Sequence, residues 1–219
     1  MVKLLGFQFI TLILFAYRLG FKKWGKKMYK QVINEIRQKT YTEDTVYIAA
    51  QKLHSVKAAE TPVKIIEMCK NMGFSVFQQE LPDEICGYIA IDGELKDRFQ
   101  TDRIISVNIK ESNKRRRFTV AHELGHFLFD FDPNSIQFYN AFEHDHDESD
   151  SPSECLASRF AAELLMPKEP FEKEYHRVFE KHSGSSEQLY ETIQTLSDLF
   201  LVPPKAVETR IKKELLLHG

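Results

Sequence analysis

The segment RRRFTVAHELGHFLFDF, residues 115–131, constrains the fold of this chain more than any other stretch. After Arg117 it is almost entirely apolar, yet it contains His122, Glu123 and His126. Because burying uncompensated ionisable groups is costly, these three side chains need partners inside the protein. Two histidines four residues apart leave the same face of a helix, as two ligands of one tetrahedral metal ion do. The pattern therefore predicts a buried helix that binds a metal.

Glu123 is rotated by about 100° around this helix from His122. That places it beside a metal held by the histidines, where a general base acting on water belongs. Gly125 lies in the middle of the same helix, where glycine costs about 1 kcal/mol relative to alanine. A glycine there predicts the close approach of another backbone segment. Two core histidines with ordinary hydrogen bonds are the structural alternative, which the cost of their burial disfavours.

The third metal ligand has to come from another part of the chain. A catalytic zinc site has three protein ligands and an open position, and no third histidine follows at the spacing HExxHxxGxxH. We therefore expect a carboxylate. Glu154 lies near the start of a predicted helix, residues 153–167, whose apolar stripe is on the same side. The helix dipole also favours an acidic residue in a first turn, so spacing alone leaves both interpretations of Glu154 open.

Other residues compete for the role of third ligand. Glu163 lies on the same predicted helix, half a helical turn out of phase. Asp130 and Asp132 follow the motif too closely to be expected as ligands. His144 and His146 lie in the acidic run EHDHDESD, which predicts a solvated loop rather than a metal site.

The remaining periodicity predicts an α+β fold, because helices precede a small sheet and further helices follow it. The motif helix is expected to start near Ser112, and a polar loop is expected over residues 140–154. Two helices are predicted before the sheet, at 42–56 and 61–74, and three strands are predicted at 74–79, 86–91 and 104–109.

The charge and the cysteines exclude some classes of protein. The formal net charge is −2, which gives no global electrostatic argument for nucleic-acid binding. Cys69, Cys86 and Cys155 are widely spaced and form no CxxC pair. This argues against a disulfide framework and against a cysteine-ligated zinc site. We expect free thiols in a reducing compartment.

Residues 4–17, LLGFQFITLILFAY, are nearly all apolar and are followed by basic residues. The run is shorter than the ~20 apolar residues of a spanning helix, and it lacks a good small-residue site for signal cleavage. If it inserts, its basic flank stays in the cytoplasm. Membrane association through residues 4–17, a packed segment and translation that starts at Met28 stay open. All three place the rest of the chain in the cytoplasm, in the first case tethered to the membrane.

Two motifs together resemble the ImmA/IrrE family of metallo-endopeptidases. RRRFTVAHELGHFLF matches the family pattern RFtxAHElGH, and ECLASRFAAELLMP matches ExxAxxFAaxLLMP. PVKIIEMCKNMGFSV resembles the family's helix before the first strand, and LSDLFLVPPKAVETRIKKE resembles its C-terminal helix pair. The resemblance covers about residues 42–213. Ser158 stands where members often have Asn.

The resemblance implies a zinc site formed by His122, His126 and Glu154, with Glu123 as the catalytic base. Mn²⁺ or Fe²⁺ could occupy the same ligands. It also implies a cytoplasmic regulatory protease that cleaves a helix-turn-helix transcriptional repressor. We expect no direct contact with nucleic acid.

The resemblance further implies a mainly helical zincin-like fold with a three-stranded sheet. Three parts are expected along the chain. Residues 1–41 form the hydrophobic and basic N-terminal segment, residues 42–183 form the metallopeptidase domain, and residues 184–219 form helix-turn-helix-like helices packed on it.

Two other functions fit parts of the sequence. A metal-stabilised module that binds a repressor without cutting it would carry the same site residues. A DNA-binding regulator would account for the helix-turn-helix-like order and for a basic cluster, Lys110 with residues 114–117. Against it, no helix has the dense basic face that phosphate contacts need.

For a peptidase, the strand at 104–109 is expected to hold the substrate as an added antiparallel strand. Tyr139, Tyr175 and His176 are candidates for stabilising the oxyanion, and no spacing distinguishes among them.

Overall fold

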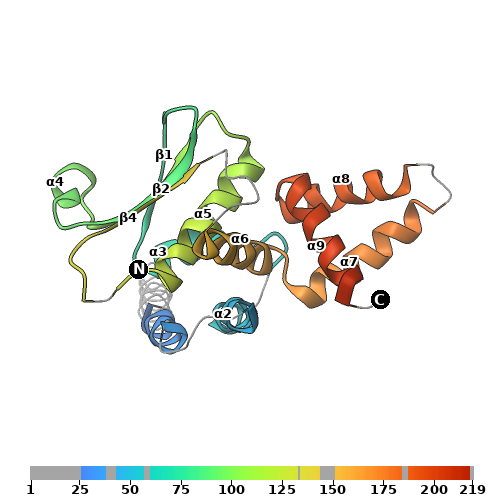
Figure 1. Ribbon diagram of the computed structural model, residues 1–219, viewed down its shortest axis with the longest axis horizontal. Coiled ribbons are helices and arrows are strands. Elements are labelled where there is room, and N and C mark those ends of the chain that lie inside the picture. Colours follow the sequence, from blue (N-terminus) through green and yellow to red (C-terminus); the bar gives the residue numbers. More distant parts are fainter. Residues whose placement is uncertain are drawn as a thin grey trace, which may run out of the picture.

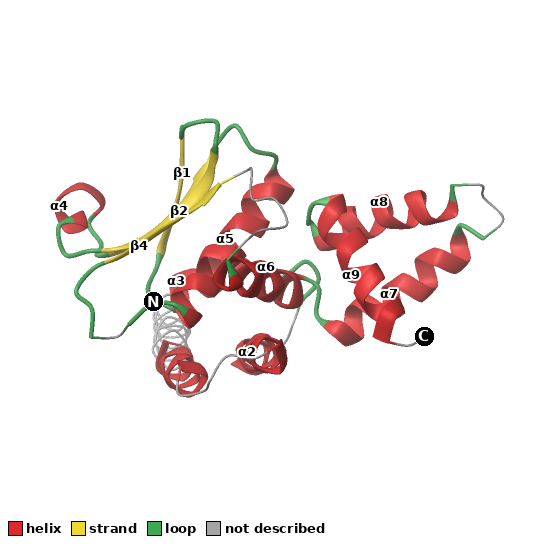
Figure 2. Cartoon of the chain, in the orientation of Figure 1, coloured by secondary structure: helices red, strands yellow, loops and turns green. Residues whose placement is uncertain are grey.

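The computed structural model describes residues 26–37, 43–56, 60–132, 134–143, 151–183 and 187–217. A small sheet lies along one side of a long central helix, and most other helices lie on the opposite side or extend from it (Figures 1 and 2). This is the α+β class that the sequence predicts. The apolar segment 4–17, His144 and His146 lie outside the described residues. Among the described helices, none has the length and apolarity needed to cross a membrane.

The central helix is α5 (Asn113–Phe129), and it begins where the sequence predicts. The Ser112 hydroxyl accepts a hydrogen bond from the backbone N–H of Arg115 and caps the first turn. Every side chain from Phe118 to Phe129 is buried, as expected for a helix that is apolar on nearly all sides. The other described helices are residues 26–37, α2 (Glu43–Val56), α3 (Ile65–Asn71), α4 (Leu95–Phe99), α6 (Pro152–Leu165), α7 (Lys168–Lys181), α8 (Gln188–Phe200) and α9 (Pro204–Leu217).

The described sheet has four strands in the order β1-β3-β2-β4. β1 (Ser75–Gln79) runs parallel to β3 (Arg103–Asn108). β2 (Ile85–Ile91) runs antiparallel to both β3 and β4 (Phe138–Glu143). The prediction of three strands and of a loop from residue 140 is therefore wrong at β4. This strand buries Phe142 and packs Phe138 against the core, but it is short and adjoins an acidic run that hides its alternation.

β3 is a central strand, which corrects the expectation that residues 104–109 hold the substrate. One edge of β3 pairs with β1, and the other edge pairs with β2. Its backbone donors and acceptors are used within the sheet, so a peptide cannot add to it. In the described sheet the outer strands are β1 and β4.

α5 and α6 cross closely at Gly125. A Cβ atom built at this glycine would lie 3.0 Å from the Cα atom of Ala157 and 3.2 Å from a ring carbon of Phe160. The absence of a side chain therefore lets the two helix backbones approach, as the sequence predicts for this position. The Ser151 hydroxyl caps α6. The crossing fixes α6 against the helix that carries the motif.

The C-terminal helices are tied to both α5 and α6. Lys114 of α5 donates to the carboxylate of Asp198 on α8 at 2.6 Å. Arg210 of α9 pairs with Glu163 of α6, and both side chains are buried. Glu163, the competing carboxylate on α6, therefore forms its ion pair with α9.

Candidate metal centre

The side chains of His122, His126 and Glu154 converge between α5 and α6. The Nε2 atoms of the two histidines are 2.9 Å apart. Oε2 of Glu154 lies 3.0 Å from Nε2 of His122, and Oε1 of Glu154 lies 3.3 Å from Nε2 of His126. Ligand atoms at about 2.0–2.1 Å from a tetrahedral metal are roughly 3.3 Å from one another. These three residues form a group that could hold a metal ion.

The other nitrogen of each imidazole already has a partner. Nδ1 of His122 lies 3.1 Å from the hydroxyl of Ser158, and Nδ1 of His126 lies 2.6 Å from Oδ2 of Asp130. Ser153 donates to the same Oδ2 at 2.6 Å. Because a carboxylate accepts, Nδ1 of His126 carries a proton and donates it. Such contacts orient metal-binding histidines and leave Nε2 for the metal.

Asp130 and Ser158 are the residues that sequence reasoning undervalues. Asp130 is too close to the motif to be a third ligand, but it lies where it can orient His126. Ser158, the departure from the family pattern, supplies its hydroxyl to His122. Each lies four residues after one of the proposed ligands, His126 and Glu154, and residues at that spacing are neighbours on a helix surface. The same i+4 spacing that pairs the histidines could have identified both.

Replacing Asp130 with Ala is expected to weaken metal binding by about 10–100-fold, because the His126 ring loses its orienting acceptor. Competition with a chromophoric chelator would measure the change. Asp132→Ala is the matched control, since Asp132 is exposed and accepts from Asn134 instead. Equal affinities of the Asp130→Ala and Asp132→Ala proteins would contradict the orienting role.

The three candidate ligands are arranged to stabilise a positive charge. Burial lowers the pKa of His122 to about 4. Burial also disfavours protonation of His126, but hydrogen bonds to Asp130 and Glu154 outweigh it and raise that pKa to about 9. Burial raises the pKa of Glu154, yet its contacts with both histidines bring it well below its usual range. One anion and two imidazole nitrogens thus face one point, which is a donor set suited to a divalent metal ion.

Glu123 lies buried beside this group, and neither carboxylate oxygen has a hydrogen bond of ordinary geometry. Burial raises its pKa to about 8, and His126 is the largest of the opposing influences. A cation held by the ligands would favour the charged carboxylate. The backbones of Phe142 and Ile89 also favour its charged form, but less than burial disfavours it. Its position therefore fits a base whose partner is a water or substrate group.

β4 closes the side of the group that faces the sheet. The ring of Phe142 stacks on the imidazole of His122, with ring centroids 3.9 Å apart and planes at 21°. Asn140, two residues earlier, shares that face of the strand, and its Nδ2 is buried without a hydrogen bond. Asn140 is thus a further buried polar group on the strand that covers the centre, and the sequence prediction omits it.

The three candidates for the oxyanion role lie on β4 and α7. Tyr139 alternates to the opposite face of β4, where its ring lies 5.6 Å from that of Tyr88. Tyr175 and His176 contact each other on α7, with ring centroids 5.5 Å apart. Burial, Tyr88 and the charge of Glu123, in that order, raise the pKa of Tyr139, so Tyr139 is within electrostatic reach of the centre.

Comparison with known proteins gives one family. A peptidase family model described as the IrrE N-terminal-like domain matches residues 86–212, from β2 into α9. No curated protein sequence matches the chain. Among solved structures, a Mycobacterium tuberculosis transcriptional regulator aligns with 16% identity and a TM-score of 0.45, over 85% of this chain and 49% of that one. The chain thus spans about half the length of that regulator.

Proposed function

Because the chain belongs to the peptidase family of the IrrE N-terminal-like domain, we propose that it is a zinc-dependent regulatory endopeptidase. The observation that carries the proposal is the convergence of His122, His126 and Glu154 beside the buried carboxyl group of Glu123. A merely structural metal site would be closed by four protein ligands, whereas the three ligands found among the described residues leave a position for a reacting group.

Each residue has a distinct role in this proposal. His122, His126 and Glu154 would hold the metal, with Ser158 and Asp130 orienting the imidazoles. Zinc bound there would polarise the scissile carbonyl and make a water easier to deprotonate. Glu123 accepts the proton of the attacking water and later donates it to the leaving amine. Its burial excludes competing solvent from this proton transfer.

The substrate is proposed to pair with β4. In the described sheet β4 is an outer strand, bonded to β2 along one edge. On the face of β4 that is directed at α5, the ring of Phe142 stacks on the imidazole of His122. An extended peptide added along the other edge would gain main-chain hydrogen bonds while lying next to the candidate metal centre. This replaces β3 as the proposed substrate strand.

The substrate class and the location of the protein rest on the family resemblance and on the cysteines. The resemblance implies cleavage of a helix-turn-helix repressor, which would relieve repression. Cys69, Cys86 and Cys155 are free thiols in the structure, in agreement with a cytoplasmic location. Zinc is proposed from the histidine and carboxylate ligands, and metal analysis distinguishes it from manganese and iron.

A cleavage assay tests this function. The full-length protein, loaded with zinc, would be mixed with a helix-turn-helix repressor encoded by a neighbouring gene. We expect two repressor fragments in the mass spectrum, and we expect a chelator to prevent their formation. A repressor that stays intact with the zinc-loaded protein would contradict the substrate class. An unselected peptide mixture that also stays intact would contradict the peptidase itself.

A further inference from the structure

We propose that Arg115 recognises an acidic side chain of the substrate and so determines specificity at the proposed active site. This inference rests on the proposed peptidase function, because it names the chemistry of the substrate that the site accepts. It arises from one basic residue whose surroundings differ from those of its neighbours in the sequence.

The basic cluster of Lys110 and residues 114–117 is mostly satisfied by internal contacts. Lys110 and Lys114 pair with carboxylates, and Arg116 and Arg117 donate to backbone carbonyls. The acceptors are Asp83 for Lys110, Asp198 for Lys114, Ile109 and Glu111 for Arg116, and Val63 and Leu201 for Arg117. Arg115 is the exception among the five, since in the described part of the chain its printed hydrogen bond goes to a thiol sulfur and not to an oxygen acceptor.

The contacts of Arg115 leave most of its guanidinium unused. Its Nη2 donates to the sulfur of Cys86 at 3.3 Å, and its Nε is buried without an acceptor. A thiol is a weak acceptor. Burial raises the pKa of Cys86, so the thiol stays neutral and provides no counterion. A half-buried guanidinium with one of five N–H groups engaged is suited to a carboxylate, which it can bind through two parallel hydrogen bonds.

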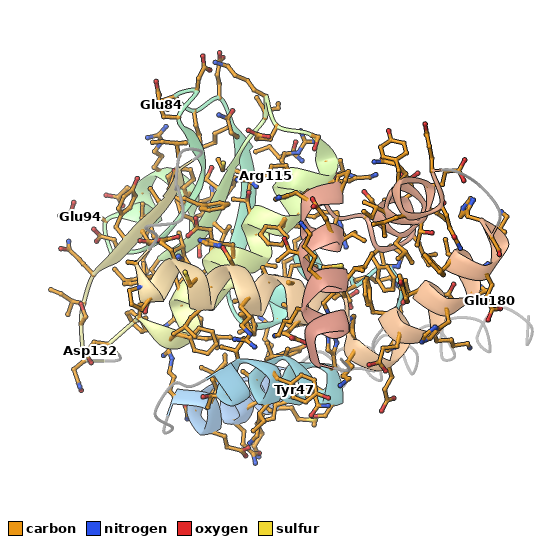
Figure 3. The ribbon with its side chains drawn as sticks, turned by 45° about the vertical axis from the view of Figure 1, so that its right-hand side comes forward. Tyr47, Glu84, Glu94, Arg115, Asp132 and Glu180 are labelled. Carbon is orange, nitrogen blue, oxygen red and sulfur yellow. The ribbon has the colours of Figure 1, made fainter. Side chains whose placement is uncertain are left out.

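Arg115 is also held close to the candidate metal centre. Its guanidinium carbon lies 4.8 Å from the ring centroid of Phe142. The ring of Phe142 in turn stacks on the imidazole of His122. Figure 3 shows Arg115 near the first turn of α5, beside the sheet. Two helical turns separate it from His122, about 10 Å along the axis. An extended peptide covers that distance in about three residues.

The charged residues at the two ends of α5 favour an anionic substrate group at the end that carries Arg115. Asp130 lies beyond His126 at the C-terminal end of α5, whereas Arg115 lies at the N-terminal end. A substrate laid along β4 would therefore meet a cation on one side of the centre and an anion on the other. A substrate carboxylate about three residues from the scissile bond, on the Arg115 side, matches this arrangement.

Binding to an inactive protein tests this without requiring catalysis. The zinc-loaded full-length Glu123→Gln protein would be titrated with labelled decapeptide pools, acetylated and amidated at their ends. The pools would differ in having Glu or Gln fixed at one position. We expect the best Glu pool to bind about tenfold more tightly than its Gln counterpart. Arg115→Met should abolish the difference, and Arg115→Lys should retain part of it.

Arg98→Met is the matched control, since the Arg98 guanidinium also lies over a phenyl ring, that of Phe99 at 5.0 Å, but on α4. It should keep the full preference for Glu. Zinc content and circular dichroism would show that each variant is folded, and Arg115→Gln offers a second neutral replacement if Arg115→Met is not.

Equal binding of the Glu and Gln pools, or a preference that survives both neutral replacements, would overturn the inference. A second set of pools, identical except for a free C-terminus, would be titrated alongside; a preference that appears solely in that set would also overturn the inference, in favour of a terminal carboxylate. A protein that cuts peptides without any preference for Glu would contradict the role of Arg115 alone. Glu-dependent binding through Arg115 without cleavage by the wild-type protein would contradict the peptidase proposal alone.

Discussion

Glu123→Gln is expected to lower kcat/KM for peptide cleavage by about 10²–10⁴-fold, the usual contribution of a general base. Gln has the shape of Glu but cannot take up the proton of the attacking water. The metal content should stay unchanged, because the candidate ligands are His122, His126 and Glu154 rather than Glu123. Rates would be measured on the cleaved repressor or a peptide from it, with zinc content measured on the same samples.

The same variant separates the peptidase from a module that binds a repressor without cutting it. Glu94→Gln is a suitable control, since Glu94 is exposed beside α4 and should leave the rate unchanged. If the Glu123→Gln protein releases repression as well as the wild type does, the catalytic interpretation fails. The metal would then contribute to repressor binding or to the stability of the folded protein.

Removing the metal is expected to lower Tm by roughly 8–16 °C. Metal present at about 1,000 times its Kd stabilises the folded state by about 4 kcal/mol. For a chain of this size each kcal/mol moves Tm by about 2–4 °C. Thermal melts with zinc and with a chelator would measure the difference. Glu154→Gln should lose most of it, because the only anionic member of the ligand group is neutralised.

Glu163→Gln is the control for that experiment, because it makes the same change on the same helix. It leaves Arg210 buried without its carboxylate, so Tm should fall with and without zinc. The zinc-dependent part of the shift should be preserved. If the zinc-dependent shift were lost in Glu163→Gln and kept in Glu154→Gln, Glu163 rather than Glu154 would be assigned as the metal ligand.

The parts of the site that could be predicted from sequence are those set by helical periodicity. His122 and His126 share a face of α5 because they are four residues apart, and Gly125 predicts the close contact that is found with Ala157. Periodicity within α6 separated Glu154 from Glu163 by half a turn. It could not decide which of the two faces the histidines, because that depends on how α6 packs. The family resemblance made that choice.

The parts that escaped prediction depend on contacts between distant segments. β1, β2 and β3 are visible in the sequence as apolar runs, but the position of β3 between β1 and β2 follows from long-range pairing. β4 is stabilised by its partner β2 more than by its own composition. Similarly, Lys110 and residues 114–117 form a basic cluster in the sequence, and the folded chain pairs four of its five members with acceptors among the described residues. Strand order and side-chain partners are properties of the folded chain.

The crossing of α5 and α6 at Gly125 has a consequence for how such a protein can diversify. Two helices in near contact bring the three candidate ligands together, so the geometry of the ligand group depends on this crossing. Changes at exposed positions that take no part in the crossing leave that geometry intact. A lineage, or a protein engineer, can therefore alter the surface that selects which proteins are admitted while the chemical apparatus is inherited unchanged.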